Sequence, residues 1–145
     1  MPLGRRRDVA ITPYLYYEDL AAAVRWLEKA FGFKPFGAQS HGPDGQLSHA
    51  AMKYGDGILM MGRRAQYKNP RRLGQTTQSL YVNVANADRH FEQAKKAGAK
   101  VLQEPADTEY GHRRYGVVDP EGHEWYFAHE LKARRRGRTS KSSKT

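Results

Sequence analysis

The pattern of apolar and polar positions at the start of the chain first predicts a strand and then a helix. Residues 9–17, VAITPYLYY, are rich in aromatic and β-branched side chains, which is typical of a strand. In the next segment, DLAAAVRWLEKAFG, the large apolar residues recur at helical spacing on one face, at Leu20, Val24, Leu27 and Phe31. Gly32 is placed to end this helix in the left-handed conformation. Gly/Asp turns then separate three further predicted strands, in residues 33–41, 46–54 and 58–62.

The same order of elements recurs in the second half of the chain. A predicted strand, QSLYVNV, is followed by a helix that Asn86 can cap and Gly98 can close. Three strands follow, AKVLQEP, HRRYGVVD and HEWYFAHEL, the last two joined by the turn PEG. Both halves read β-α-β-β-β, so the sequence indicates an internal duplication and an α+β fold made of two tandem βαβββ modules.

The duplication divides the chain into five segments. We expect a basic extension, a first module, a basic linker, a second module and a basic disordered tail, in residues 1–8, 9–62, 63–77, 78–131 and 132–145. The linker, RRAQYKNPRRLGQTT, is long for a loop, and such loops either connect modules or carry function.

The net charge of +10 first suggests a nucleic-acid-binding protein, but the excess charge lies at the two ends. Arg5, Arg6 and Arg7 carry three positive charges, and residues 132–145 carry seven more. Between Asp8 and Leu131, 15 basic residues balance all 15 acidic ones. The tails could therefore make weak, nonspecific, salt-sensitive contacts with nucleic acid, although the sequence has no recognition-helix or zinc-finger pattern.

Two further observations concern location. The sequence contains no cysteine, which excludes disulfides and thiolate sites. It also has no apolar run approaching eighteen residues and no signal-peptide pattern, so we expect a cytoplasmic protein without a membrane partner.

The sharpest motif is Asp119-Pro120-Glu121-Gly122-His123, the turn before the last predicted strand. With two βαβββ modules and the stretches HAAMKYGDGILMM and EYGHRRYGVVDPEGHEW, it resembles the vicinal-oxygen-chelate superfamily, which includes glyoxalase I, bleomycin-resistance proteins and extradiol dioxygenases. The stretches look especially like the glyoxalase-related branch close to PhnB proteins. The resemblance implies paired modules whose sheets curl around a central cup, often assembled as a homodimer.

Metal-using relatives place four His or Glu ligands in the first and last strand of each module. By position, these sites correspond here to Thr12, Ser79, Tyr126 and either Met60 or Met61. Hydroxyl and thioether groups do not form a site for Zn²⁺, Ni²⁺ or Fe²⁺, so we expect no metal and no other cofactor. A nonstandard metal site that combines His49 with His112 or Glu124 is the alternative.

Strand alternation sorts the side chains into two faces without reference to the family. The face opposite the apolar one is aromatic and hydrogen-bonding, as in a small-molecule pocket, and comprises Thr12, Tyr14, Tyr16, Ser79, Tyr81, Asn83, Glu124 and Tyr126. The alternative is that these tyrosines only fill space between sheets.

His49 and Arg114 are the candidate catalytic or anchoring residues. Aligning Gly57 with Gly122 gives an offset of 65, which carries His49 onto Arg114. An arginine here could hold a carboxylate, phosphonate or phosphate, and a neutral histidine could act as a general base. We expect four other histidines, His41, His90, His123 and His129, to lie on the surface.

Three functions remain open at this stage. The first is a metal-free protein, similar to bleomycin-resistance proteins, that binds or sequesters a small aromatic or anionic molecule. The second is an enzyme with nonstandard metal ligands, expected to be a glyoxalase-like lyase or isomerase or a dioxygenase-type enzyme. The third is an accessory protein that binds acidic partners through its tails.

Overall fold

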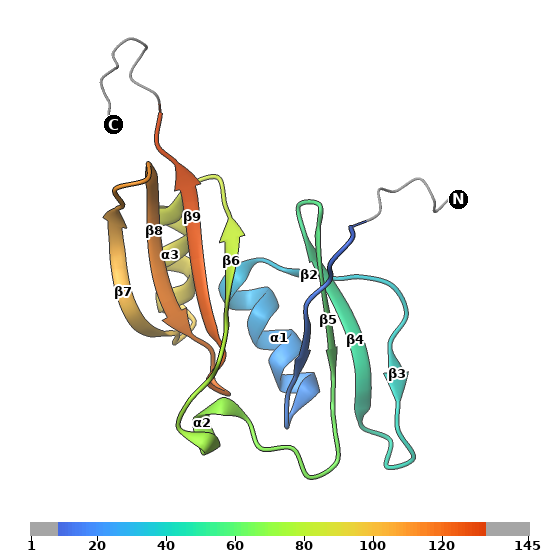
Figure 1. Ribbon diagram of the computed structural model, residues 1–145. Helices are drawn as coiled ribbons and strands as arrows, with labels where there is room; N and C mark the ends of the chain where they lie inside the picture. The colour runs from blue at the N-terminus through green and yellow to red at the C-terminus, as the bar shows by residue number, and fades with distance from the viewer. Residues whose placement is uncertain (1–8, 133–145) are drawn as a thin grey trace.

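The computed structural model describes residues 9–132 and contains two βαβββ modules in tandem, which confirms the predicted fold (Figure 1). The first module consists of β1 (Tyr14–Tyr16), α1 (Leu20–Phe31), β2 (Lys34–Pro35), β3 (Ser40–His41), β4 (Leu47–Tyr54) and β5 (Gly57–Gly62). The second consists of β6 (Ser79–Asn83), α3 (Ala87–Lys96), β7 (Lys100–Asp107), β8 (His112–Val118) and β9 (Glu124–Glu130). A short helix, α2 (Pro70–Leu73), lies between the modules.

Each module forms its own sheet, with the first strand of the module at one edge. The strand order is β1-β5-β4-β2 in the first sheet, where β3 also pairs with β4, and β6-β9-β8-β7 in the second. The first and last strands of each module are parallel, and the remaining neighbours are antiparallel. Within the described residues, no strand of one sheet pairs with a strand of the other. The cup implied by the family resemblance is therefore not closed by strand pairing inside residues 9–132.

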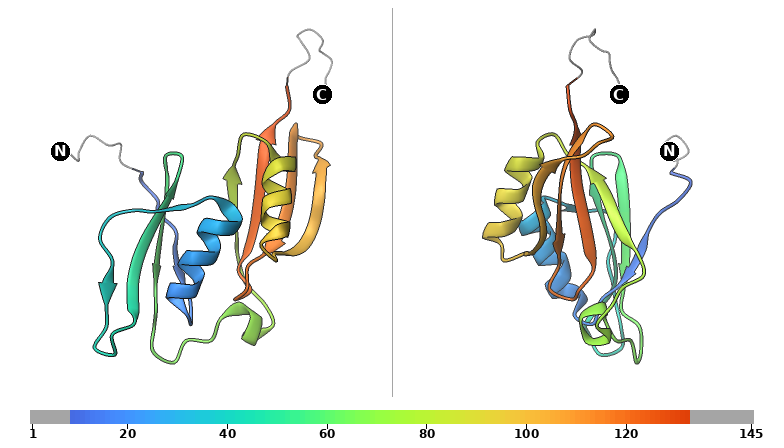
Figure 2. Two further views of the ribbon diagram at one scale, coloured as in Figure 1. Left: turned by 180° about the vertical axis from the view of Figure 1, so that it is seen from behind. Right: turned by 60° about the vertical axis from the view of Figure 1, so that its left-hand side comes forward.

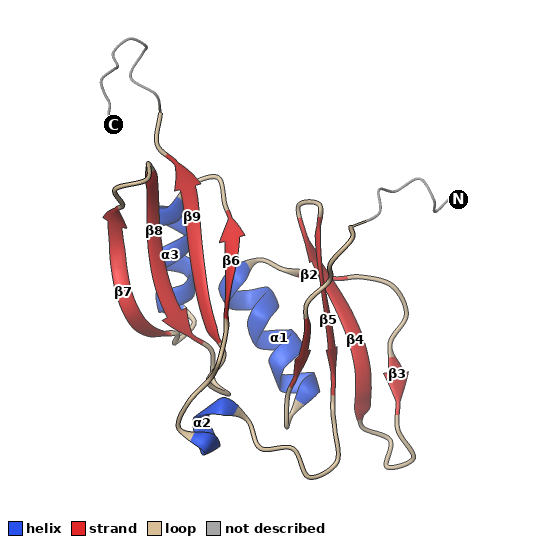
Figure 3. Cartoon of the chain, in the orientation of Figure 1, coloured by secondary structure: helices blue, strands red, loops and turns tan. Residues whose placement is uncertain are grey.

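Both long helices cover the same side of the molecule, so each sheet keeps one face open. In Figure 1, α3 lies behind β8 and β9 and α1 is seen between the two sheets, and both helices come to the front when the molecule is seen from behind in the left view of Figure 2. In the secondary-structure colouring of Figure 3, the red strands of both sheets face the viewer without a helix in front of them. The open faces of the two sheets are thus available to a ligand or a partner.

Local capping signals explain where the helices begin and end. The side chain of Asp19 accepts a hydrogen bond from the amide of Ala22 at the start of α1, and Gly32 ends the helix with φ = 79°. Asn86 accepts from the amide of Arg89 at the start of α3, as the sequence predicted. These contacts satisfy backbone groups that a helix terminus leaves unpaired.

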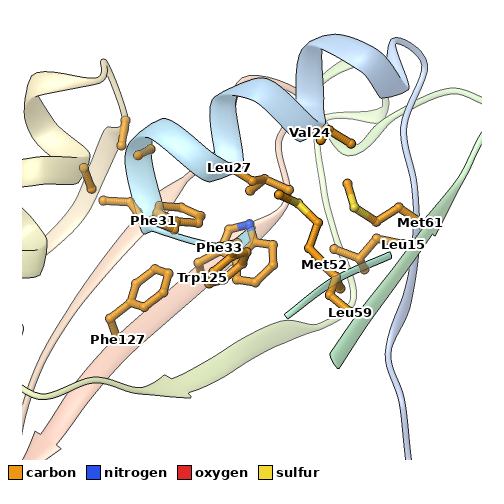
Figure 4. Packing of buried hydrophobic residues seen from close by; sticks show 14 of the residues in the cluster. Leu15, Val24, Leu27, Phe31, Phe33, Met52, Leu59, Met61, Trp125 and Phe127 are labelled. Atoms are coloured by element: carbon orange, nitrogen blue, oxygen red, sulfur yellow. The ribbon is translucent and has the colours of Figure 1, made fainter. Parts of the chain in front are cut away.

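A single aromatic core joins the modules (Figure 4). The ring of Phe31, at the end of α1, lies 4.6 Å from the ring of Phe127 and 5.3 Å from that of Trp125, both on β9. The indole nitrogen of Trp26 also donates to the carbonyl of Ala97 across the two helices, at 2.9 Å. Burial of large apolar side chains is the dominant favourable contribution to folding, so the two modules stabilise each other.

Some strand predictions are only partly met. The strand expected at residues 33–41 is divided into β2 and β3, which have two residues each, because Gly37 takes a positive φ of 74° between them. The first strand is confined to Tyr14–Tyr16. Among the described residues, no helix is both long and apolar enough to cross a membrane.

Candidate functional site

The open faces carry the predicted site residues, distributed over both sheets. On the first sheet Tyr14, Tyr16 and His49 lie together with Met60, while Leu15 and Met61 point into the core. On the second sheet the same face holds the larger set, Ser79, Tyr81, Asn83, Arg114, Glu124 and Tyr126. The structure thus gathers the predicted residues into two groups, one on each module.

Arg114 is the most unusual side chain on the second open face. Its guanidinium carbon lies 4.8 Å from the ring centroid of Tyr126. Its Nε is buried and has no hydrogen-bond partner among the described residues. The neighbouring Arg113 points to the other face, where it binds both Asp88, at 3.0 Å, and Asp107, at 2.9 Å. Arg113 is therefore neutralised within the fold, whereas none of the ion pairs found in residues 9–132 involves Arg114.

The absence of a side chain at Gly116 leaves room for the ring of Tyr126. Gly116 lies next to Tyr126 in the β8–β9 ladder. A Cβ built on Gly116 would lie 2.5 Å from Cε1 of Tyr126, so a side chain here would displace the ring. The ring rests against β8 at Gly116, and the guanidinium of Arg114 from the same strand lies within cation–π distance of it.

Tyr81 and His112 form a polar pair beside Arg114. The Tyr81 hydroxyl lies 2.7 Å from His112 Nδ1 and 3.5 Å from the Tyr110 hydroxyl. Burial raises the pKa of Tyr81 to about 12, with further contributions from Tyr110. The phenol consequently stays protonated at neutral pH and can donate to the imidazole. Tyr110 is absent from the sequence-based prediction, because it lies in the turn before β8 and no strand periodicity includes it.

The first module holds a similar pair at a different position. The Tyr14 hydroxyl lies 3.0 Å from His49 Nδ1, and its ring lies over Gly62. In the strand ladders, His49 is aligned with Gly62 and Tyr16, as Arg114 is aligned with Ala128 and Asn83. His49 and Arg114 therefore occupy equivalent positions in the two modules, the relation that the offset of 65 predicts.

A groove of about 720 Å³ runs between the edges of the two sheets. Its floor includes the core residues Phe33 and Trp125, and its walls carry Tyr14 and Tyr81. Ile11, which also lines it, is 83% exposed. The groove thus presents apolar surface that the described chain does not cover.

The turn that carries the sharpest motif holds the modules together and does not face the groove. Asp119 is buried and accepts hydrogen bonds from Tyr17 and Trp125 at 2.7 and 3.1 Å. The Glu121 carboxylate accepts from the backbone amides of Glu18 and Asp19, at 2.6 and 2.8 Å. Residues 119–123 therefore join the second module to the start of α1.

Two histidines expected on the surface are buried. His90 is 8% exposed and lies between the hydroxyl of Tyr115, at 2.5 Å, and the carbonyl of Phe31, at 2.8 Å. Burial lowers its pKa below the ordinary value. His123 is 6% exposed, and its Nε2 lies 2.9 Å from the carbonyl of Tyr16. The surface prediction was wrong because each histidine binds a backbone carbonyl of the first module, that of Phe31 for His90 and that of Tyr16 for His123, which local sequence patterns do not reveal.

Comparison with known proteins gives the family. The sequence model of the Glyoxalase/Bleomycin resistance protein/Dioxygenase superfamily matches residues 9–127. The chain belongs to this superfamily. The assignment to a PhnB-like branch within the superfamily stays a prediction.

Two relatives show how this superfamily member compares in sequence. It is 35% identical over 125 residues to the uncharacterized protein Rv0887c of Mycobacterium tuberculosis, covering 81% of this chain and 72% of the relative. It is 34% identical to TioX from Micromonospora sp. ML1, whose crystal structure gives a TM-score of 0.70 and covers 86% of this chain and 100% of TioX.

A third structure resembles it in fold alone. A superfamily enzyme from Burkholderia phytofirmans PsJN is 18% identical, with a TM-score of 0.64, covering 83% of this chain and 97% of the other.

The metal chemistry of some superfamily members does not fit the residues here. The ladders place Met60 opposite Tyr14 and Tyr126 opposite Tyr81, so Met60, not Met61, is the counterpart of Tyr126 on the open face. With Thr12 and Ser79, the four ligand positions provide three hydroxyls and one thioether, which are poor ligands for Zn²⁺ or Fe²⁺. In residues 9–132, no three side chains of His, Asp or Glu are grouped so that they could hold a metal ion.

Proposed function

We propose that this superfamily member is a metal-free binding protein for a small planar aromatic anion, which Arg114 anchors on the open face of the second module. The observation that carries the proposal is the contrast between the two neighbouring arginines. Arg113 has two carboxylate partners, while Arg114 stacks on Tyr126 with an unpartnered, buried Nε in the described structure. A buried polar group without a partner is costly, and a carboxylate ligand would supply the missing acceptor.

The surroundings of Arg114 support an aromatic ligand. Tyr126, Tyr81 and Tyr110 provide rings that can stack on a planar molecule or pack against its edge. The hydroxyl of Tyr81 and the imidazole of His112 supply polar contacts within the same face. In this role the protein binds or sequesters its ligand, and no reaction step is required of His49 or Arg114.

We further propose that the protein acts as a homodimer in the cytoplasm. The dimer is supported by the exposed apolar side chains along the groove, including Val9 and Ile11, because a second copy would remove them from water. Light scattering on the purified protein is expected to give twice the chain mass of 16.5 kDa. A monomer at micromolar concentration would contradict this part of the proposal.

The binding proposal is tested with two ring compounds that differ in charge, 2-naphthoate and 2-naphthamide. A charge-assisted hydrogen bond contributes about 1.5–3 kcal/mol, so Arg114→Gln is expected to weaken 2-naphthoate binding about 10- to 100-fold in calorimetry. Binding of 2-naphthamide should change little. Arg113→Gln is the matched control, because Arg113 points away from this face. Equal affinity of wild type and Arg114→Gln for 2-naphthoate would refute the anchor.

Metal analysis tests the remaining alternative. Protein purified from its own host without a histidine tag is expected to contain no stoichiometric Ni, Zn, Fe or Mn. Stoichiometric metal that is lost in His49→Ala would favour the enzyme with nonstandard ligands.

A further inference from the structure

The segment between the modules is held at both ends, although its sequence reads as a plain connector. At its start, the amide of Arg63 donates to the carbonyl of Ser48 at 3.0 Å, and the guanidinium of Arg63 binds Asp44 at 3.1 Å. At its end, Asn69 donates through its backbone amide to Glu18 at 2.9 Å and through its side chain to Glu121 at 3.0 Å. Residues 64–68 are therefore confined between two anchored residues, Arg63 and Asn69.

An uncommon backbone conformation directs this segment toward the open face. Gln66 has φ = 59°, the sole positive φ at a non-glycine position in residues 9–132. The amide of Tyr67 donates to the carbonyl of Arg64 at 3.3 Å, closing a tight turn. A left-handed conformation at a residue with a side chain is disfavoured, and such residues cluster at functional sites.

The turn places two side chains of the segment on Tyr16. The ring of Tyr67 lies 5.7 Å from the ring of Tyr16, and the guanidinium carbon of Arg64 lies 5.1 Å from the same ring centroid. Tyr14 follows Tyr16 at 5.4 Å, and His49 follows Tyr14 at 5.8 Å. The result is a continuous row of four rings on the first sheet, with the guanidinium of Arg64 over its second ring, Tyr16.

Arg64 repeats the arrangement of Arg114 in the other module. Each belongs to an Arg-Arg pair in which the first arginine binds aspartate and the second lies over a tyrosine ring. No ion pair among the described residues uses Arg64. The two pairs are not related by the duplication, because Arg63–Arg64 follows β5 and Arg113–Arg114 lies within β8. The same chemistry has thus been assembled twice from different parts of the chain.

We propose that Arg64 and Tyr67 form, with Tyr14 and Tyr16, a second binding wall for a planar aromatic carboxylate, here called the linker wall. The ligand class rests on the proposed function, but the location is independent of it. The N–H groups of Arg64 bind the carboxylate, and the row of tyrosines stacks against the ring. Burial raises the pKa of Tyr67 to about 12, with contributions from Glu121, Asp119 and Glu18, so its phenol stays neutral at the pH of the test and the ring adds no negative charge to the wall.

The test is an NMR titration of the full chain with 2-naphthoate. In wild type, amide shifts are expected in two groups, at residues 14–16 and 63–68 for the linker wall and in β8–β9 for the Arg114 site. Arg114→Gln should remove the second group and leave the first. Adding Arg64→Gln to this variant should weaken the remaining binding about tenfold, since a charge-assisted contact is lost. Adding Arg25→Gln instead is the charge-matched control, because Arg25 is exposed on α1 away from the linker wall, and it should leave the binding within about twofold.

The outcomes separate the two proposals. If only β8–β9 responds to 2-naphthoate, the linker wall is overturned and the proposed function stands. If only the linker wall responds, the anchor at Arg114 is overturned and this inference stands. If neither region responds, both fail. Tyr67→Leu keeps an apolar group but removes the ring, so unchanged binding to this variant would also overturn the role of Tyr67.

Discussion

Removal of the Asp119 carboxylate is expected to cause a large loss of stability, because it is the acceptor on which several buried donors depend. Its Oδ2 accepts from the hydroxyl of Tyr17 at 2.7 Å and from the indole of Trp125 at 3.1 Å. Its Oδ1 accepts from the backbone amides of Glu121 and His123, at 3.1 and 3.0 Å. In Asp119→Ala all four donors lose this acceptor.

The size of the loss follows from burial. Tyr17 and Trp125 are each 1% exposed, so water cannot replace the carboxylate at either. At about 1–3 kcal/mol for each stranded buried donor, Asp119→Ala should lower the free energy of unfolding by about 2–6 kcal/mol. For a domain of this size that corresponds to a melting temperature lower by roughly 10–15 °C at the middle of the range.

Asp119→Asn separates this explanation from a general effect of mutation. Its amide oxygen can keep the two backbone donors, and its NH₂ can donate to the Tyr17 hydroxyl, which is free to rotate. The indole of Trp125 would then face a second donor, and the Tyr17 O–H would lose its acceptor, so two of the four donors are stranded and we expect about half the loss of Asp119→Ala. Urea unfolding followed by circular dichroism measures both variants. A loss below about 1 kcal/mol in Asp119→Ala, or equal losses in the two variants, would refute the claim that Asp119 stabilises the fold as a hydrogen-bond acceptor.

Two other predictions concern pH and a turn glycine. Because burial lowers the pKa of His90 in the folded state, the unfolded chain takes up a proton first as the pH falls. The free energy of unfolding should therefore be highest above about pH 6.5 and decline below it, with a smaller decline in His90→Gln; equal slopes would contradict this assignment. Gly122 has φ = 100°, and a Cβ there would collide with the backbone of Arg71. Gly122→Ala is expected to cost more than about 2 kcal/mol in the same urea assay. Gly111→Ala, at φ = 89° with open space around it, should cost only about 1 kcal/mol, and similar costs would count against the collision.

The sequence predicted those parts of the fold that depend on local signals. Caps at Gly32 and Asn86 act within one turn of their helix, and strand alternation sorted the side chains of β9 correctly. The short helix α2 was missed because its residues, PRRL, carry no apolar period. It is fixed mainly by Asn69, which caps it and binds Glu18 and Glu121 from both modules. Contacts of this range leave no trace in a window of neighbouring residues.

The residues of the candidate site also fall into those that the sequence could assign and those that it could not. Tyr14, Tyr16 and Tyr126 could be assigned to the open face because each lies in a strand with period two. Arg64 and Tyr67 lie in a loop, and only the turn at Gln66 brings them onto Tyr16. Loops have no periodicity from which a side-chain direction can be inferred, so their contribution to the site becomes visible only in three dimensions.

The duplication explains why the two open faces are comparable and yet unequal. Equivalent positions differ by 67 residues between β1 and β6, by 66 between β5 and β9 and by 65 between β4 and β8, as the ladders show. No single offset would have aligned the modules, because the loops between strands differ in length while the ladders are maintained by hydrogen bonds. At one such position the first module has His49 where the second has Arg114. Strand β4 therefore lacks the arginine that β8 places on the second open face. An arginine reaches the first face from outside the strands, because Arg64 of the linker lies over the ring of Tyr16. If both faces bind anions, Arg64 replaces the arginine that β4 lacks, and Arg64→Gln in the Arg114→Gln background should weaken binding at the first face about tenfold in the NMR titration.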